Sequence, residues 1–362
     1  MTLSVFILTT NRLRLLKDCL ESTLTALPPQ SEIIIAVNGY FPKTTAWLSQ
    51  LNDPRVHWFE KKMESPGYSR NIAFEVCQGE IIYFLDDDVI VPRHLFTNAT
   101  QLFRDFRDFS ILGGPNLTPT DSSWNEKLYG AIMTSPFAAP MVRQRYYCGS
   151  GKKTASPRNS NKASHQILTA SERELILCNL AIRRSQIPKN IRFRQTLLCN
   201  EENLFLYECR KAQQKIGYST KLFVYHRRRR SLSHFLQQIF RYGTGRGQQT
   251  LKAPFSCHPA FLIPPVAVIL GVILIAFGQW LILLSLIATH HLLSLLGILF
   301  SEDLRNLGPY ATLLTIPLTL FLHTAYGIGF WRGIAVEFRS VLLKSRKDGQ
   351  LECEPSPIIA MP

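Results

Sequence analysis

The sequence predicts an α/β fold, a mostly parallel mixed sheet with helices on both faces, followed by a C-terminal transmembrane helical region. Short apolar segments alternate with segments of helical spacing over about the first 230 residues, which is typical of a parallel sheet covered by helices. Residues 261–300 and 306–331 contain no Asp, Glu, Lys or Arg. Because about 20 apolar residues cross a bilayer, a purely soluble protein is excluded.

The first 90 residues contain the elements that are easiest to recognise. We expect strands at residues 3–8, 32–37, 55–60 and 80–85, each of them a short apolar segment. Apolar residues three or four positions apart predict helices at residues 11–24 and 69–77. A turn at Asn38-Gly39 closes the second strand, and the second helix ends near Gly79.

Basic residues outnumber acidic ones, with 41 Lys and Arg against 26 Asp and Glu and a net charge of +15. Many of them flank the apolar region, at residues 226–230 on one side and 332–347 on the other. Such flanks mark the cytoplasmic side and attract anionic headgroups, so they favour a membrane surface over nucleic acid as the partner. The first twelve residues lack the features of a signal peptide, so we expect the first domain to stay in the cytosol.

The chain divides into four expected parts. They are an α/β domain at residues 1–230, a basic membrane-proximal interfacial helix at 231–258, two or three transmembrane helices at 259–331, and a basic amphipathic helix with a polar tail at 332–362. Residues 261–300 fit a hairpin and 306–331 fit a third span, but basic flanks on both sides require an even number. Either one segment is re-entrant or interfacial, or residues 261–300 form one span and one surface helix.

Three consecutive aspartates, Asp86, Asp87 and Asp88, directly follow the fourth strand. Open α/β sheets bind ligands at the carboxyl ends of their strands. In an extended chain Asp86 and Asp88 point to the same side, so together they can hold Mg²⁺ or Mn²⁺ through oxygen. The alternative is an acidic turn that caps a helix expected to begin near Pro92.

Five segments of the chain resemble, in order, the motifs of family-2 glycosyltransferases. They are Ser4–Arg12, Pro66–Asn71, Gly79–Asp88, Asn200–Leu204 and Gln238–Tyr242. They cover about residues 3–250, and Leu175–Arg184 is similar to the family's segment beside the sugar and acceptor. The resemblance implies a GT-A nucleotide-sugar-binding fold in a membrane-bound enzyme of the bacterial type, which transfers a sugar with inversion.

The resemblance also implies roles for individual residues. Nucleotide-sugar binding falls to Thr9, Asn11, Arg12, Asn38, Arg70, Asp86, Asp87 and Asn179. Acceptor or diphosphate binding falls to Gln238, Arg241 and Tyr242. The metal, Mg²⁺ or Mn²⁺, falls to Asp86, Asp88 and His226. Glu202 is the expected catalytic base, with Glu201 as its neighbour.

The chemistry of the transfer supports these roles. A divalent ion at the aspartates neutralises the departing nucleotide diphosphate, and Arg70 on the preceding helix can contact a phosphate. Inversion needs a general base on the opposite face of the sugar, which Glu202 can supply. The alternatives are a solvated Arg70, an acidic helix start at Glu201 and Glu202, and a His226 that merely precedes a basic segment.

Two positions depart from the family's pattern. The second strand ends at Asn38, where the family has an Asp that helps to bind the nucleotide, so no base is assigned. Tyr242 replaces the Trp of processive synthases, so no processivity is inferred.

The polar residues 149–166 are expected to form a mobile loop over the acceptor. We expect a lipid-linked or glycan acceptor in cell-surface polysaccharide assembly; the alternatives are a polyprenyl-phosphate sugar synthase and an inactive GT-A scaffold.

Overall fold

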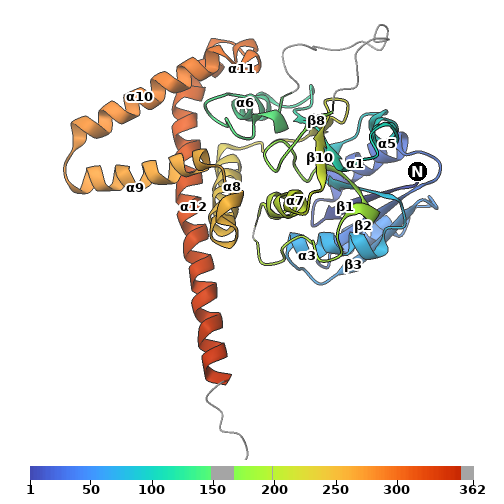
Figure 1. Ribbon diagram of the computed structural model, residues 1–362. Coiled ribbons are helices and arrows are strands. Elements are labelled where there is room, and N and C mark those ends of the chain that lie inside the picture. The colour runs from blue at the N-terminus through green and yellow to red at the C-terminus, as the bar shows by residue number, and fades with distance from the viewer. Residues whose placement is uncertain (148–166, 198, 352–362) are drawn as a thin grey trace, which may run out of the picture.

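The computed structural model describes residues 1–147, 167–197 and 199–351, with side chains as far as residue 340. The loop expected at residues 149–166 lies outside this range. In Figure 1 an α/β domain lies on one side and a group of C-terminal helices on the other. The long helix α8 (Leu232–Lys252) follows the α/β domain in the chain and lies against the C-terminal group.

The main sheet has eight strands in the order β3-β2-β1-β4-β9-β6-β10-β8. Their bounds are β1 (Leu3–Thr9), β2 (Ser31–Asn38), β3 (Val56–Lys61), β4 (Ile81–Asp86), β6 (Phe109–Gly113), β8 (Leu168–Thr169), β9 (Asn179–Arg183) and β10 (Lys215–Tyr218). The strands β1 to β4 are parallel, whereas β9 is antiparallel to both β4 and β6. This is the mixed α/β sheet that the sequence predicts, and all four expected strands are present.

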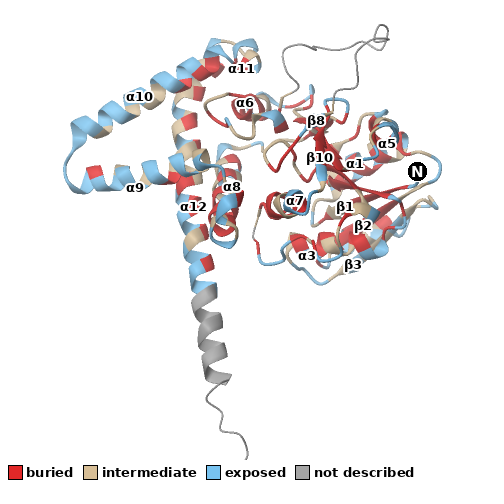
Figure 2. Cartoon of the chain, in the orientation of Figure 1, coloured by how far each residue is buried: buried red, intermediate tan, exposed pale blue. Residues whose placement is uncertain are grey.

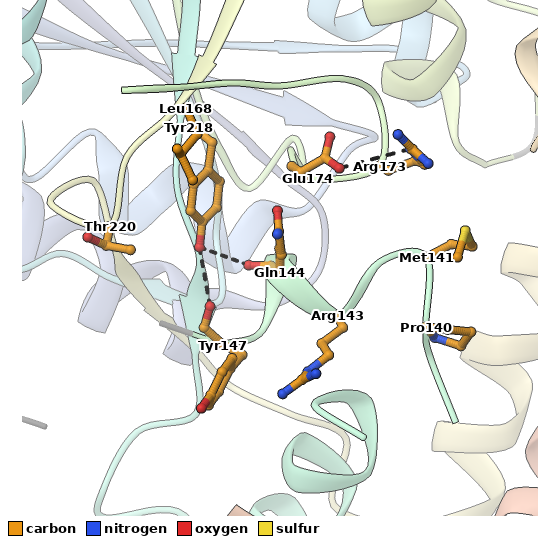
Figure 3. Close-up of a pocket in the computed structure, with 10 residues that line it drawn as sticks. All are labelled: Pro140, Met141, Arg143, Gln144, Tyr147, Leu168, Arg173, Glu174, Tyr218 and Thr220. Atoms are coloured by element: carbon orange, nitrogen blue, oxygen red, sulfur yellow. Dashed lines mark hydrogen bonds and ion pairs between the residues drawn. The ribbon is translucent and has the colours of Figure 1, made fainter. Parts of the chain in front are cut away.

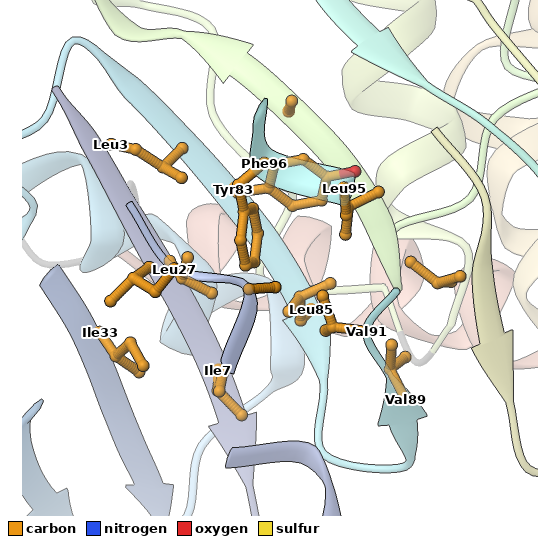
Figure 4. Packing of buried hydrophobic residues seen from close by; sticks show 14 of the residues in the cluster. Leu3, Ile7, Leu27, Ile33, Tyr83, Leu85, Val89, Val91, Leu95 and Phe96 are labelled. Carbon is orange, nitrogen blue, oxygen red and sulfur yellow. The ribbon is translucent and has the colours of Figure 1, made fainter. Parts of the chain in front are cut away.

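Helices cover both faces of this sheet because its central strands are apolar at almost every position. Val5 and Ile7 of β1 pack into a cluster with α1 (Leu13–Ala26) and α5 (Leu95–Asp105), whereas Phe6 points to the opposite face. Figure 4 shows the first cluster, in which Tyr83 lies against Phe96, with ring centroids 5.3 Å apart. Two buried faces fix the register of the strands and therefore the positions of the residues that follow them.

A smaller sheet of three short strands stands beside the main one. It has the order β5 (Val89–Ile90), β11 (Val224–His226) and β7 (Asn116–Leu117). In this sheet β11 is antiparallel to β5, with His226 opposite Val89. This pairing brings a late segment of the chain against the turn that follows the three aspartates.

The remaining helices of the α/β domain differ from the sequence prediction in one of them. They are α2 (Pro42–Leu48), α3 (Pro66–Asn71), α4 (Ala73–Val76), α6 (Trp124–Met133) and α7 (Glu201–Lys211), with 3₁₀ turns at Arg143–Arg145 and Arg184–Gln186. The helix expected at residues 69–77 begins earlier and is divided at Ile72. Its early start follows from Ser65, whose side chain accepts a hydrogen bond from the Tyr68 backbone, and from Pro66 in the first turn.

The C-terminal helices are α9 (Ile263–Ala276), α10 (Trp280–Leu299), α11 (Glu302–Asn306) and α12 (Pro309–Leu351), preceded by 3₁₀ turns at Pro254–Ser256 and Pro259–Leu262. Three segments are long and apolar enough to cross a membrane, Pro259–Ala276, Trp280–Leu299 and Pro309–Ser340. The basic helix expected from residue 332 is not a separate element, because α12 continues through it. In Figure 2 most of α9 and α10 is exposed.

Candidate active site

Polar side chains gather where the parallel strands end. Thr9 and Asp86 are the last residues of the neighbouring strands β1 and β4, and Asn38 ends β2. Since carboxyl ends of parallel strands meet at one edge, these side chains share that edge. Residues of α3, α7 and β11 contact the same edge through the ion pairs described below.

Arg70 of α3 bridges two carboxylates that are far apart in the sequence. Its Nη2 donates to Asp86 Oδ1 at 3.0 Å, and its Nη1 contacts Glu201 Oε1 at the start of α7. The residue is 9% exposed, so it is not the solvated arginine that was the alternative. Burial raises the pKa of Glu201 to about 7, in spite of the opposing Arg70 charge and with a further contribution from Glu202.

Asp87 and Asp88 point to a different set of partners. Thr9 Oγ1 donates to Asp87 Oδ2 at 2.6 Å, and Arg12 contacts Asp87 and donates to Asp88 Oδ2 at 2.7 Å. Burial raises the pKa of Asp87 to about 7, although the Arg12 charge acts against it. Burial would also raise the pKa of Asp88, but the charges of His226, Arg12 and Arg229 outweigh it and hold this pKa well below its usual range.

His226 is positioned by strand pairing. Because it lies opposite Val89 in the small sheet, its ring is next to Asp88, with 2.9 Å between His226 Nε2 and Asp88 Oδ1. Its other ring nitrogen, Nδ1, is 3.2 Å from Arg228 Nη1. His226 is therefore part of the carboxylate cluster and does more than precede a basic segment.

Of the predicted metal ligands, His226 lies close to both aspartates, but the three-residue group that the described residues form contains Cys178 in place of Asp88. Asp86, Cys178 and His226 each offer one ligand atom, and these atoms lie within 4.8 Å of one another. No described donor makes a well-aligned hydrogen bond to the buried Asp88 Oδ1. Ligands bound about 2.1 Å from an octahedral ion lie roughly 3 Å apart, which matches the spacing of Asp88 Oδ1 and His226 Nε2.

Cys178 is the member of this cluster that sequence reasoning missed. It directly precedes β9 and carries no motif of its own. Burial raises the pKa of its thiol well above the usual value, so the sulfur stays protonated. A neutral, soft thiol is a poor ligand for Mg²⁺ or Mn²⁺, so the oxygens and the imidazole carry the fit.

Glu202 lies in the first turn of α7 and is 8% exposed. Arg145 is its ionic neighbour, with 3.8 Å from Arg145 Nη1 to Glu202 Oε1. Arg145 also donates to Asn203 Oδ1 and to the Arg173 carbonyl, so it is firmly held. Sequence reasoning missed Arg145 because it belongs to no recognised motif. Arg145 lies just before residues 148–166, which the structure does not describe.

Three asparagines that were predicted to bind the nucleotide sugar differ in how many hydrogen bonds their side chains already make within the protein. Asn38 accepts from the Glu64 backbone at 2.9 Å and donates to its carbonyl, which closes the loop after β3. Asn179 accepts from Tyr83 Oη at 2.6 Å and donates to backbone carbonyls of Pro115 and Leu222. Both amides are buried, whereas Asn11 is exposed. Asn38 and Asn179 therefore hold the framework of the site.

The predicted acceptor residues lie on α8. Gln238 Nε2 donates to Tyr242 Oη at 2.9 Å, whereas Arg241 is exposed. The backbone carbonyl of Tyr242 accepts from Asn200, a left-handed residue (φ 63°) at the start of α7, which ties α8 to the Glu202 helix. A small cavity is lined by Tyr129, Met133, Tyr146, Arg228, Arg229, Phe235, Gln238, Ile239 and Tyr242. It combines two arginines with apolar side chains.

A larger cavity of about 480 Å³ lies elsewhere in the α/β domain (Figure 3). Its lining is Pro140, Met141, Arg143, Gln144, Tyr147, Leu168, Arg173, Glu174, Tyr218 and Thr220. Tyr218 Oη donates to the carbonyls of Gln144 and Tyr147 at 3.0 and 3.3 Å. None of the predicted site residues lines it, and its walls adjoin the undescribed residues 148–166, so we assign it no role.

Comparison with known proteins bears on the family and the fold. Residues 4–167 match the model of glycosyl transferase family 2. The solved mannosyltransferase PcManGT from Pyrobaculum calidifontis, in complex with GDP-Man and Mn²⁺, has a TM-score of 0.60 at 13% identity, over 91% of this chain and 87% of that one. TarS 1–349 of S. aureus in complex with UDP-GlcNAc has a TM-score of 0.46 at 15% identity, over 94% and 92%, which is too distant to carry an argument.

A search of the curated proteins gives no match. The family match covers the segment that contains β1 to β7, the three aspartates and Arg70. The fold of PcManGT extends the likeness over most of the chain. The match to glycosyltransferase family 2 therefore covers residues 4–167, 164 of the 362 residues, and the likeness to PcManGT is one of fold.

Proposed function

We propose that the protein is a membrane-associated, metal-dependent inverting glycosyltransferase. It moves a sugar from a nucleotide-diphosphate sugar to a lipid-linked or glycan acceptor in the assembly of a cell-surface polysaccharide or glycoconjugate. The observation that carries the proposal is that His226 groups with Asp86 and pairs with Asp88, while Arg70 joins Asp86 to Glu201, the neighbour of Glu202 in α7. The GDP-Man and Mn²⁺ bound by PcManGT support a nucleotide-sugar donor and a divalent ion for this chain as well.

The aspartates and His226 hold the donor end of the site. Asp86, Asp88 and His226 are the residues that would bind Mg²⁺ or Mn²⁺, which supplies positive charge to the departing diphosphate. Arg12 keeps the Asp88 carboxylate fixed from the other side, at 2.7 Å. Arg70, held between Asp86 and Glu201, presents a guanidinium at the same edge and favours a phosphate there.

Glu202 is the proposed general base. The two glutamates at the start of α7 have different partners, because Glu201 is paired with Arg70 whereas Glu202 lies 3.8 Å from Arg145. The pKa of Glu201, raised to about 7, would also suit a general base, but its Oε1 is already held by Arg70. Glu201 therefore positions Arg70, and Glu202 takes the proton of the acceptor hydroxyl.

The acceptor approaches from α8. Gln238, Tyr242, Arg228 and Arg229 line a cavity whose other walls include Phe235 and further apolar side chains. Arginines suit the phosphates of a lipid-linked saccharide, and the apolar walls suit its lipid. Arg241, exposed on the same helix, is the third proposed contact. The basic flanks of the apolar region favour the cytoplasmic face of an inner membrane for the catalytic domain.

Transfer assays on the full-length protein in membrane vesicles test the proposal. Each labelled nucleotide sugar is added with Mn²⁺ or Mg²⁺, and the label should move to a lipid-extractable product with one donor only. Two phosphates in that product indicate a lipid-linked saccharide acceptor, and one phosphate indicates the polyprenyl-phosphate sugar synthase. A donor that raises the melting temperature of the solubilised protein without any hydrolysis or transfer would identify an inactive scaffold and contradict the proposal.

A further inference from the structure

The helix α12 is covered along one whole face by the α/β domain and α8. Buried positions recur every three or four residues over its described length, at Ala311, Thr315, Thr319, Leu322, Phe330, Gly333 and Glu337. Near the start of α12, His323 Nε2 lies 3.1 Å from the carbonyl of Ala138, which follows α6. Thr134 at the end of α6 lies 3.2 Å from Ser301, just before α11. The first half of α12 is therefore docked on the catalytic domain.

The second half of α12 is docked on α8 at very short range. A Cβ added to Gly243 would lie 2.1 Å from the Tyr326 carbonyl oxygen, and one added to Gly333 would lie 2.0 Å from that of Thr244. The seam ends in polar contacts, because Glu337 accepts from Gln248 and from Lys252. A helix whose own buried carboxylate, Glu337, meets an amide and an ammonium group of its partner along this face does not lie in hydrocarbon.

The opposite face of α12 is exposed and apolar. Its exposed side chains again recur at helical spacing, at Tyr310, Leu313, Phe321, Ile328, Trp331 and Phe338. Arg332 and Arg339 are exposed beside the last of them. An apolar stripe flanked by arginines, on a helix already fixed to a domain by its other face, is typical of a helix that lies in the membrane interface.

The α9–α10 hairpin (residues 263–299) projects from α12 on the side away from the catalytic domain (Figure 1). Its base is docked, since Trp331 Nε1 donates to the Pro265 carbonyl at 2.9 Å and Gly297 packs against Phe137. Beyond these contacts residues 269–276 and 280–289 project, about 12 and 15 Å at 1.5 Å per residue. The turn between them carries no charged side chain.

We propose that the chain binds the bilayer from one side only, with α12 in the interface and the tip of the α9–α10 hairpin inserted into a single leaflet. A projection of about 15 Å matches half of a hydrocarbon core of about 30 Å, so the tip ends near the midplane. The basic segments before and after the apolar region then lie on the same side. Basic segments on both sides of the apolar region require an even number of membrane crossings, and in this arrangement that number is zero. The chain then does not cross the bilayer, in contrast to the multi-pass topology that the sequence suggests.

This inference goes beyond the proposed function and is tested without an activity assay. The variant Gln279→Cys, at the tip, is labelled with the polarity-sensitive fluorophore NBD in detergent and reconstituted in sealed vesicles of neutral and anionic phospholipid. Matched variants carry the label on the catalytic domain (Lys62→Cys) and near the basic end of α12 (Arg339→Cys), both exposed positions. Labelled wild-type protein gives the background of the native cysteines. Membrane-impermeant dithionite then destroys every label that faces the outer solution.

The expected result is equal dithionite-accessible fractions for the Lys62 and Arg339 labels, and a blue-shifted, protected label at position 279. Quenching of the tip label by brominated lipids should be strongest with bromines near the ends of the acyl chains. A tip label whose accessible fraction is the complement of the Lys62 fraction would establish a full crossing and overturn the proposal. A tip label that follows the Lys62 fraction would overturn it as well, because the hairpin would then lie in water on the catalytic side.

Discussion

The central strands and the α9–α10 hairpin are built from the same residue types in opposite environments. Val5 and Ile35 in the sheet are 0% exposed, whereas Val272 and Leu281 in the hairpin are 60% and 83% exposed (Figure 2). In the sheet, helices of the same chain cover the apolar side chains. In the hairpin the described part of the chain covers only a few positions, among them Pro265 and Ile298. A charge-free apolar segment therefore indicates removal from water, and only its neighbours decide whether protein or lipid removes it.

The two regions also differ in where their polar contacts lie. At the sheet edge the carboxylates of Asp86, Asp88 and Glu201 each face a cation. In the C-terminal region the closest contacts are made by glycines along the α8–α12 seam, and the ion pair of Lys252 with Glu337 lies at its end. Chemistry and membrane attachment should therefore respond to different substitutions, and four predictions test that separation.

The largest effect is expected for Glu202→Gln. If Glu202 takes the acceptor's proton, transfer should fall by about 10³-fold in kcat, while affinity for the nucleotide sugar stays nearly unchanged. Glu201→Gln is the matched control, because it should disturb Arg70 and weaken donor binding instead. Titration calorimetry beside a transfer assay separates the two. Normal transfer by Glu202→Gln together with loss in Glu201→Gln would move the base by one residue.

Asp88→Asn should lower activity by at least about 10²-fold, because it keeps the size of the side chain and removes a charge from the proposed metal site. The share of protein in the membrane fraction should not change. Excess EDTA should inactivate the wild type, and added Mn²⁺ should restore it. Asp108→Asn, an exposed aspartate paired with Lys215, is the control and should behave as wild type. Full activity in EDTA would refute the metal mechanism.

Gly247→Val should destabilise the packing of α8 on α12 by about 1–3 kcal/mol, the usual cost of overpacking a tight contact. A Cβ there would lie 2.1 Å from the Phe330 carbonyl oxygen. Gly271→Val is the matched control, because a Cβ at that position of α9 meets nothing within 4 Å. Thermal unfolding in detergent measures both variants. Equal melting temperatures would show that the seam is not close-packed.

The smallest of the four effects is expected for Arg70→Ala. Loss of a charge-assisted phosphate contact should weaken nucleotide-sugar binding by roughly tenfold. Arg70→Lys should recover only part of the loss, since lysine cannot bridge Asp86 and Glu201 in the arginine geometry. A variant with unchanged donor affinity but reduced kcat would assign Arg70 to the transition state alone.

Local sequence patterns determined the framework of the catalytic domain. The strands β1, β2 and β4 are contiguous apolar segments, which predicts their burial, and the first of the three aspartates ends β4. Arg70 and Glu201 lie in short motifs that are weak singly and were recognised from their order along the chain. The early start of the next helix depends on the cap at Ser65. Its division at Ile72 was not predicted.

The tertiary structure alone decided which of these residues meet. His226 reaches Asp88 because β11 pairs with β5, Arg145 joins the site from a segment without any motif, and Cys178 lies in a resembling segment in which only Asn179 was singled out. Composition predicted α12 as a span, but glycines and polar side chains of α8 cover one face of it. Contacts between distant segments set these outcomes, since the free energy of burying a side chain depends on what packs against it and not on its position in the chain.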